Sequence, residues 1–147
     1  MTRQVLSRFA LASLLALPFA AGAANPVIEV YKTATCGCCK QWIKHLEANG
    51  FTVKAQDVAN TGDYRAKFGI PADYGSCHTA RVGGYAVEGH VPASDIKRLL
   101  AEKPKAKGLA VPAMPLGSPG MEGPRKDPYD VLLVQADGKT KVFKHYN

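Results

Sequence analysis

The chain has 147 residues, of which 46% are hydrophobic and 21% charged, and its formal net charge is +7. This length suits one folded domain with its own core. The lysines are scattered rather than gathered in a basic run with interleaved aromatic residues, so the composition argues against a nucleic-acid-binding protein.

The first residues have the three parts of a secretory signal peptide. Residues 1–8 carry two arginines and no acid, residues 9–19 form a short apolar run, and residues 21–24 are small. A membrane anchor is less favoured because the apolar run is shorter than the ~20 residues that a span needs. We therefore expect residues 1–24 to be cleaved and residues 25–147 to form a single periplasmic domain with no membrane span.

A βαβ unit is predicted at the start of this domain. Residues 26–32 are rich in β-branched side chains and indicate a strand. Apolar residues at helical spacing after Cys39 predict a helix that ends at Asn49-Gly50. Residues 51–56 alternate apolar and polar side chains, as a second strand does. The two strands should be parallel, with a right-handed crossover.

Three further elements follow in the middle of the chain. Asn60 or Thr61 can cap a short helix. Residues 79–82 and 85–87 predict a β-hairpin, because two glycines join them. Ser94 is expected to cap the next helix.

Residues 103–128 differ in composition from the rest of the chain. Six prolines and four glycines fall in these 26 residues, which predicts a segment without regular structure. Long irregular segments are often functional, and this one holds Met114 and Met121. After this Pro/Gly/Met loop, residues 129–135 and 139–145 predict a C-terminal β-hairpin.

Three cysteines lie close together between the first predicted strand and the first helix. Cys36 and Cys39 have the C-x-x-C spacing of a redox pair, and with Cys38 they form a dense group of soft metal ligands. A helix start favours thiolates through its free N–H groups and partial positive charge. A bridge between the neighbours Cys38 and Cys39 would strain the backbone, whereas a redox-active Cys36–Cys39 bridge remains open.

The predicted order β-α-β-α-β-β-α, with C-x-x-C after the first strand, resembles the thioredoxin-like fold. That resemblance implies an α/β fold with a central mixed sheet, flanked by helices, in which the third strand is antiparallel to the first. Cys77, His78 and His90 would then meet the three clustered cysteines at one sheet edge. Ordinary thioredoxins have a cis-proline where this chain has Cys77-His78, which argues against general disulfide exchange and adds a ligand.

Four motifs narrow the resemblance. They are C-G-C-C at 36–39, S-C-H-T-A at 76–80, V-E-G-H-V-P at 87–92 and M-P-L-G-S-P-G-M-E at 114–122. Together they are similar to the CopG-type family, a group of small exported bacterial proteins described as having a domain of unknown function. The resemblance implies a Cu(I) site on the C-x-C-C cysteines and Cys77. It also implies a role in copper resistance, with copper or thiol redox activity as an option.

The ligand types favour Cu(I) over zinc. Four thiolates suit tetrahedral Zn²⁺ or bridged Cu(I), but structural zinc sites draw on separated cysteine pairs, whereas the crowding here suits thiolates shared between several Cu(I) ions. Thioethers are poor zinc ligands and suit Cu(I), so Met114 and Met121 could fold over the site as a lid. His90 is expected to be a ligand or to support one. His78 is less favoured, because strand alternation would turn it away from Cys77, and His45 is expected to be solvated.

Two main functions remain open at this point. The first is a periplasmic copper-binding protein that buffers Cu(I) or passes it on, as a metallochaperone, to other periplasmic copper-handling proteins. Its expected ligands are Cys36, Cys38, Cys39, Cys77, His90, Met114 and Met121. The alternative is a thiol–disulfide oxidoreductase with Cys36 as nucleophile and Cys39 as resolving thiol. A third hypothesis is a zinc-stabilised binding module, which predicts that the protein unfolds when a chelator removes the zinc.

Overall fold

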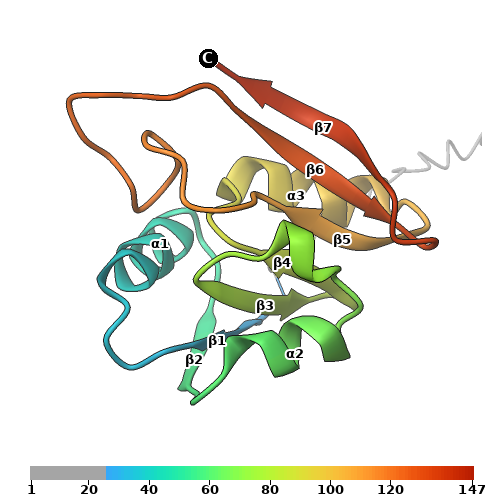
Figure 1. Cartoon of the computed structure of the whole chain (residues 1–147), viewed down its shortest axis with the longest axis horizontal. Helices are drawn as coiled ribbons and strands as arrows, with labels where there is room; N and C mark the ends of the chain where they lie inside the picture. Colours follow the sequence, from blue (N-terminus) through green and yellow to red (C-terminus); the bar gives the residue numbers. More distant parts are fainter. Residues whose placement is uncertain (1–25) are drawn as a thin grey trace, which may run out of the picture.

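A computed structural model describes residues 26–147. The predicted signal peptide, residues 1–24, lies outside the described residues. The described chain forms one seven-stranded mixed sheet with helices on both faces (Figure 1). The elements in chain order are β1 Ile28–Lys32, α1 Gly37–Ala48, β2 Val53–Asp57, α2 Thr61–Lys67, a 3₁₀ turn Ala72–Tyr74, β3 His78–Val82, β4 Tyr85–Glu88, α3 Ala93–Glu102, β5 Ala106–Ala110, β6 Tyr129–Gln135 and β7 Thr140–Tyr146.

The first four strands have the arrangement that the thioredoxin-like resemblance implies. The sheet order is β2-β1-β3-β4-β5-β6-β7, and β1 pairs parallel with β2 but antiparallel with β3. A tight turn through Gly83 and Gly84, both with positive φ, joins β3 to β4 as an antiparallel hairpin. The expected α/β fold with a central mixed sheet is therefore confirmed, and so is the C-terminal hairpin of β6 and β7.

The expectation that residues 103–128 lack regular structure is wrong at its start, because β5 lies there. This strand pairs parallel with β4 and antiparallel with β6. Gly108 permits the pairing, since a Cβ on it would lie 1.8 Å from the carbonyl oxygen of Ala86. Leu109 and Ala110 are fully buried. The segment from β5 to β6 is irregular, as expected, and in Figure 1 it runs out past the sheet towards α1.

Two layers of apolar side chains hold the sheet between its helices. On one face, Trp42 and Leu46 of α1 and Ile96 and Leu99 of α3 pack against the strands. A smaller cluster on the other face includes Phe68, next to α2. The three cysteines at the start of α1 are thus attached to a helix that is anchored in the main core, which gives them a rigid support.

The predicted helix starts are right for one helix and wrong for another. Asn60 caps α2, because its side chain accepts a hydrogen bond from the N–H of Gly62. Ser94 does not cap α3: the helix starts at Ala93 after Pro92, which makes no side-chain cap. The N–H of Ala93 is instead bound by the Nε2 of His45 at 3.1 Å, so a side chain from α1 takes the place of a local cap.

None of the helices within residues 26–147 has the length and apolar character that a membrane span requires.

Candidate metal centre

The start of α1 places three sulfur atoms close together. Cys36 is the N-cap of the helix, and its Sγ accepts a hydrogen bond from the N–H of Cys39 at 3.3 Å. Gly37 follows as the first helical residue, so Cys38 and Cys39 fall in the first turn. The sulfur atoms therefore lie where the N–H groups and the dipole of the helix favour negative charge.

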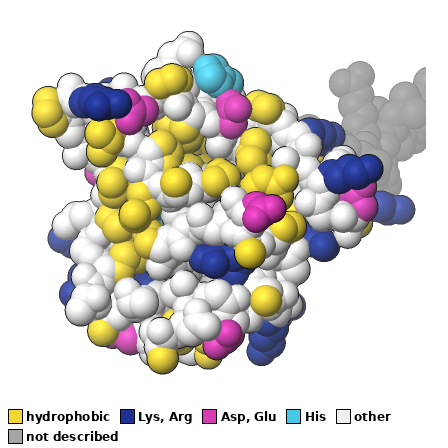
Figure 2. All heavy atoms as spheres, viewed as in Figure 1, with side chains coloured by type: hydrophobic (Ala, Val, Ile, Leu, Met, Phe, Trp, Pro, Cys, Tyr) yellow, Lys and Arg dark blue, Asp and Glu magenta, His cyan; other side chains and the backbone are white. Residues whose placement is uncertain are grey.

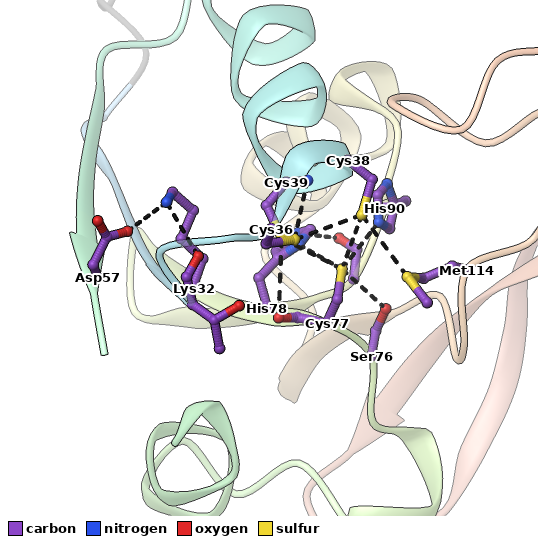
Figure 3. Close-up of a disulfide and its surroundings, with 12 residues drawn as sticks. Lys32, Cys36, Cys38, Cys39, Asp57, Ser76, Cys77, His78, His90 and Met114 are labelled. Carbon is purple, nitrogen blue, oxygen red and sulfur yellow. Dashed lines mark hydrogen bonds and ion pairs between the residues drawn. A yellow bond between two sulfur atoms is a disulfide. The ribbon is translucent and has the colours of Figure 1, made fainter. Parts of the chain in front are cut away.

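Cys77 joins these three cysteines from another segment, just before β3. Its Sγ lies 3.5 Å from the Sγ of Cys39 and 3.7 Å from that of Cys38, and the Sγ of Cys38 lies 3.5 Å from that of Cys36. All four Sγ atoms lie within 4.8 Å of one another (Figure 3). The thioredoxin-like topology brings them together, because the end of β1 and the start of the antiparallel β3 share one edge.

Two of the four cysteines are joined in a disulfide. Cys36 and Cys39 form the bridge, with their Cα atoms 5.4 Å apart, and Cys38 and Cys77 are free and partly exposed. This is the bridge that C-x-x-C spacing left open. The molecule is thus seen in an oxidised form, and two electrons and two protons would convert it to a form with four thiols in one cluster.

Two imidazoles face the sulfur of Cys77. The Nε2 of His90 lies 3.2 Å from it and the Nδ1 of His78 lies 3.4 Å from it. Burial is the main cause of a raised pKa of Cys77, at about 12, and the neighbouring Cys38 adds to the rise. Without metal, Cys77 is therefore a neutral thiol at pH 7, and a bound cation would have to displace its proton.

The second nitrogen of each imidazole fixes its tautomer. The Nδ1 of His90 donates to the carbonyl oxygen of Pro119 at 2.7 Å, and the Nε2 of His78 donates to that of Gly89 at 3.0 Å. Burial lowers the pKa of both residues, that of His78 to about 3, so both rings are neutral at pH 7. A neutral ring has its lone pair on the other nitrogen, so both rings direct a lone pair at Cys77.

The structure changes the expectations for two histidines. His78 was expected to turn away from Cys77 by strand alternation, but Cys77 lies in a bend before β3 and alternation does not reach it. His78 therefore lies within the cluster, and the sequence signal that could have found it was its place next to a cysteine outside the strand. His45 is partly buried and bonded to Ala93 rather than solvated.

The loop between β5 and β6 reaches the cluster through Met114. Its Sδ lies 3.8 Å from the Sγ of Cys38, and the residue is 45% exposed. Met121 also lies in this loop, where its backbone bonds to Gly117 and Ser118, and no hydrogen bond within residues 26–147 joins its thioether to the cluster. The structure thus brings Cys36, Cys38, Cys39, Cys77, His90 and Met114 together, with His78 added.

Gly120 fits this loop against the start of α1. A Cβ at this position would lie 2.8 Å from both the carbonyl oxygen of Cys38 and the backbone nitrogen of Trp42. Only a glycine can bring the loop so close, and its φ of 89° also favours glycine. In the space-filling view, apolar side chains gather over the part of the molecule where this loop meets α1, and most lysines and arginines lie at the margins of that face (Figure 2).

Lys32, four residues before Cys36, takes no part in the cluster. Lys32 is buried, and its amine pairs with Asp57 and donates to the carbonyl oxygen of Thr33. Figure 3 shows this pair to one side of the sulfur atoms, pointing away from them. The amine of Lys32 thus joins β1 to β2 by an ion pair.

The arrangement suits a soft metal ion. Cysteine sulfur, a thioether and imidazoles in one place are ligands that copper and other soft metal ions accept, and hard cations prefer oxygen. No peptide bond in residues 26–147 is cis, so the proline that thioredoxins use beside their redox pair has no counterpart there.

Comparisons with known proteins agree with this description. A family described as "Protein of unknown function, DUF411" matches residues 74–121. No match was found among curated proteins. Two solved structures are similar, both of a copper resistance protein CopG. Form 2 is 48% identical with a TM-score of 0.80 and covers 84% of this chain and 99% of that chain; form 1 is 48% identical with a TM-score of 0.78 and covers 83% and 98%.

Proposed function

The chain belongs to the family of the copper resistance protein CopG, and on this premise we propose that it is a periplasmic protein that binds Cu(I) for copper resistance. The observation that carries the proposal is the group of four cysteine sulfur atoms within 4.8 Å of one another. Sulfur atoms at this spacing can be shared between metal ions, and Cu(I) prefers soft ligands of this kind. The predicted signal peptide supports export, since a chain with such a segment is secreted.

Each ligand has a part in the proposed site. Cys38 and Cys77 are free in the oxidised form and hold the first ion, with the thioether of Met114 beside Cys38 and the imidazole of His90 beside Cys77. Reduction of the disulfide adds the thiolates of Cys36 and Cys39. Met121 assists when the loop closes over the metal. Oxidation of the cysteine pair therefore lowers the capacity for copper, and reduction raises it.

The proposed role is to buffer Cu(I) or to pass it to other periplasmic copper-handling proteins. Cysteine ligands exchange one at a time with those of a partner, so a tight site can still release its ion rapidly. Met114 is 45% exposed and lies beside Cys38, so an incoming partner can reach this side of the cluster. Direct transfer from the loaded protein to a copper-accepting domain, faster than spontaneous release into a chelator, is the measurement that tests this role.

A redox step can accompany binding. When Cys36 and Cys39 form their disulfide they release two electrons and two protons, enough to reduce two Cu(II) ions to Cu(I). The test mixes the reduced protein with Cu(II) under anaerobic conditions and follows loss of the Cu(II) electron paramagnetic resonance signal together with loss of thiols. A Cu(II) signal that persists with all four thiols intact would exclude this step.

The alternative is a thiol–disulfide oxidoreductase, and the Cys36–Cys39 bridge at a helix start favours it. Cys36 is partly exposed and Cys39 is buried, which suits a nucleophile and a resolving thiol. This reading leaves Cys38, Cys77 and Met114 without a part. Cys38→Ser separates the two functions, because it should spare disulfide exchange but weaken a copper site that uses several cysteines.

A further inference from the structure

Two segments that are far apart in the sequence each supply a side chain to the cluster, and the two segments also contact each other. Cys77 lies before β3, and Met114 lies in the loop after β5, yet both contact the sulfur of Cys38. In Figure 3, Cys38 comes from α1, whereas Cys77 and Met114 approach it from these two separate segments. Some contact must hold the two segments in register, because small displacements of a ligand weaken a metal site.

Residues 75, 76 and 113, which directly precede these two ligands, make that contact. The hydroxyl of Ser76 donates to the carbonyl oxygen of Ala113, and the N–H of Ala113 donates to the carbonyl oxygen of Gly75 at 3.2 Å. Each segment thus gives one donor and one acceptor to the other. The next residue along one segment is Cys77, and the next along the other is Met114.

The backbone of Ala113 shows that this contact constrains the loop. Its φ is 59°, in the left-handed region that residues other than glycine seldom adopt. A residue persists in this region only when its surroundings hold it there, and both polar backbone groups of Ala113 are bound to residues 75 and 76. The direction in which the chain leaves Ala113 decides where Met114 lies.

Ser76 is itself held by a buried ion pair. Glu88, at the end of β4, is fully buried, and its Oε1 accepts from the N–H of Ser76 at 2.7 Å and from the Nε of Arg65 at 2.8 Å. The Nη2 of Arg65 donates to the carbonyl oxygen of Ser76 at 2.7 Å. Both backbone groups of Ser76 are therefore fixed by charged partners from α2 and β4, which leaves its hydroxyl aimed at Ala113.

We propose that Ser76 is a positioning residue of the metal site: anchored by Arg65 and Glu88, it holds Ala113 so that the thioether of Met114 stays on the sulfur of Cys38. The inference rests on the proposed function, since it concerns the same site. Ser76 is not proposed as a ligand, although its hydroxyl also lies 4.0 Å from the sulfur of Cys77. Its part is to join the Cys77 segment to the Met114 segment.

Ser76→Ala tests the proposal. The acceptor at Ala113 is exposed, so water can replace the hydroxyl and the variant should fold. We expect Cu(I) affinity to fall about tenfold. This corresponds to the free energy of one hydrogen bond, because without that bond Met114 is no longer held beside Cys38. Met114→Ala should weaken binding similarly. Adding Ser76→Ala to it should cost much less than Ser76→Ala costs alone, because only the long contact of the hydroxyl with the sulfur of Cys77, 4.0 Å, is then left to lose. Thr140→Val is the control, since it removes another partly buried hydroxyl bond, to the hydroxyl of Tyr74 at 3.4 Å, from a strand outside the loop.

A second measurement does not involve copper. In the methyl NMR spectrum of the reduced, copper-free protein, Ser76→Ala should move the signal of Met114 towards its free-chain position and leave that of Met121 unchanged. Glu88→Gln, which weakens the anchor, should shift the same signal. An unmoved Met114 signal overturns the inference. The inference also fails if Ser76→Ala lowers the Cu(I) affinity of the Met114→Ala variant as much as it lowers that of the wild type. A wild-type protein that binds no Cu(I) defeats the proposed function alone, because the methyl signal still decides the part of Ser76.

Discussion

Gly120 offers a sharp test of how the loop is seated on the cluster. In Gly120→Ala the new Cβ would lie 2.8 Å from the carbonyl oxygen of Cys38 and from the backbone nitrogen of Trp42, and 3.2 Å from the Nδ1 of His90. The first two atoms belong to the backbone of α1 and cannot rotate away. Ordinary van der Waals contact begins at 3.4 Å, so the loop must retreat by 3.4 − 2.8 = 0.6 Å.

The retreat has a calculable cost. It lengthens the bond between the Nδ1 of His90 and the carbonyl oxygen of Pro119, now 2.7 Å, to about 3.3 Å, where a hydrogen bond is weak. Its loss costs about 1 kcal/mol of unfolding free energy, and an alanine with the φ of Gly120 adds about 1–2 kcal/mol. Because that carbonyl fixes the tautomer of His90, Cu(I) affinity should fall about 10–100-fold, as for other residues that orient a metal ligand.

The assay is a competition titration with a Cu(I) chelator, together with chemical unfolding of the copper-free protein. Gly123→Ala is the matched control, because a Cβ there meets nothing within 4 Å and its φ is not positive. We expect the control to match the wild type in both measurements. If Gly120→Ala also binds Cu(I) as tightly as the wild type, the loop does not position His90 and the reasoning fails.

Three more predictions follow from the cluster. The protein with the Cys36–Cys39 disulfide should bind fewer Cu(I) ions than the reduced protein, and equal stoichiometry by metal analysis after gel filtration would contradict this. Stability should fall as pH drops from 6.5 towards 3, by about 1.4 kcal/mol per pH unit, because His78 stays neutral when folded and takes a proton when unfolded. In denaturant unfolding at several pH values, His78→Gln should lose the share of the slope that belongs to His78 and keep that of His90, whose pKa burial also lowers. An unchanged slope would refute the assignment. Gly37→Ala should leave Cu(I) affinity unchanged, since a Cβ there meets nothing within 4 Å, and a loss above about threefold would show that the glycine itself is needed.

Most helices and strands could be predicted from the sequence, because the patterns that specify them are local. Apolar periodicity, the pair Asn49-Gly50 and the turn at Gly83-Gly84 each specify one element with little help from the rest of the chain. β5 was missed because its glycine and the nearby prolines suggest a loop. Only the approach of Gly108 to Ala86 on the neighbouring strand makes that glycine a requirement. This contact is non-local, and no window of the sequence contains it.

The candidate site likewise has parts that the sequence predicts and parts that depend on contacts between distant segments. The four cysteines could be placed at one sheet edge because topology alone brings the ends of β1 and β3 together. Sequence reasoning undervalued His78, because it applied strand alternation to Cys77 and His78, although Cys77 lies in a bend before β3. Ser76 and Glu88 each lie in one of the four motifs, but nothing in the sequence pairs them with each other or with Arg65. Their network becomes visible only when burial shows that the carboxylate has its partners inside the protein.

The central claim is that the clustered sulfur atoms form a Cu(I) site. Its most direct test is an anaerobic titration of the fully reduced protein with Cu(I) against a competing chelator, with zinc in parallel. We predict tight binding of more than one Cu(I) per chain, a strong loss of binding in Cys77→Ser, and weaker binding of zinc. Weak Cu(I) binding, or binding that Cys77→Ser leaves unchanged, would contradict the account. If the same protein then reduced a test disulfide readily, the oxidoreductase would take its place.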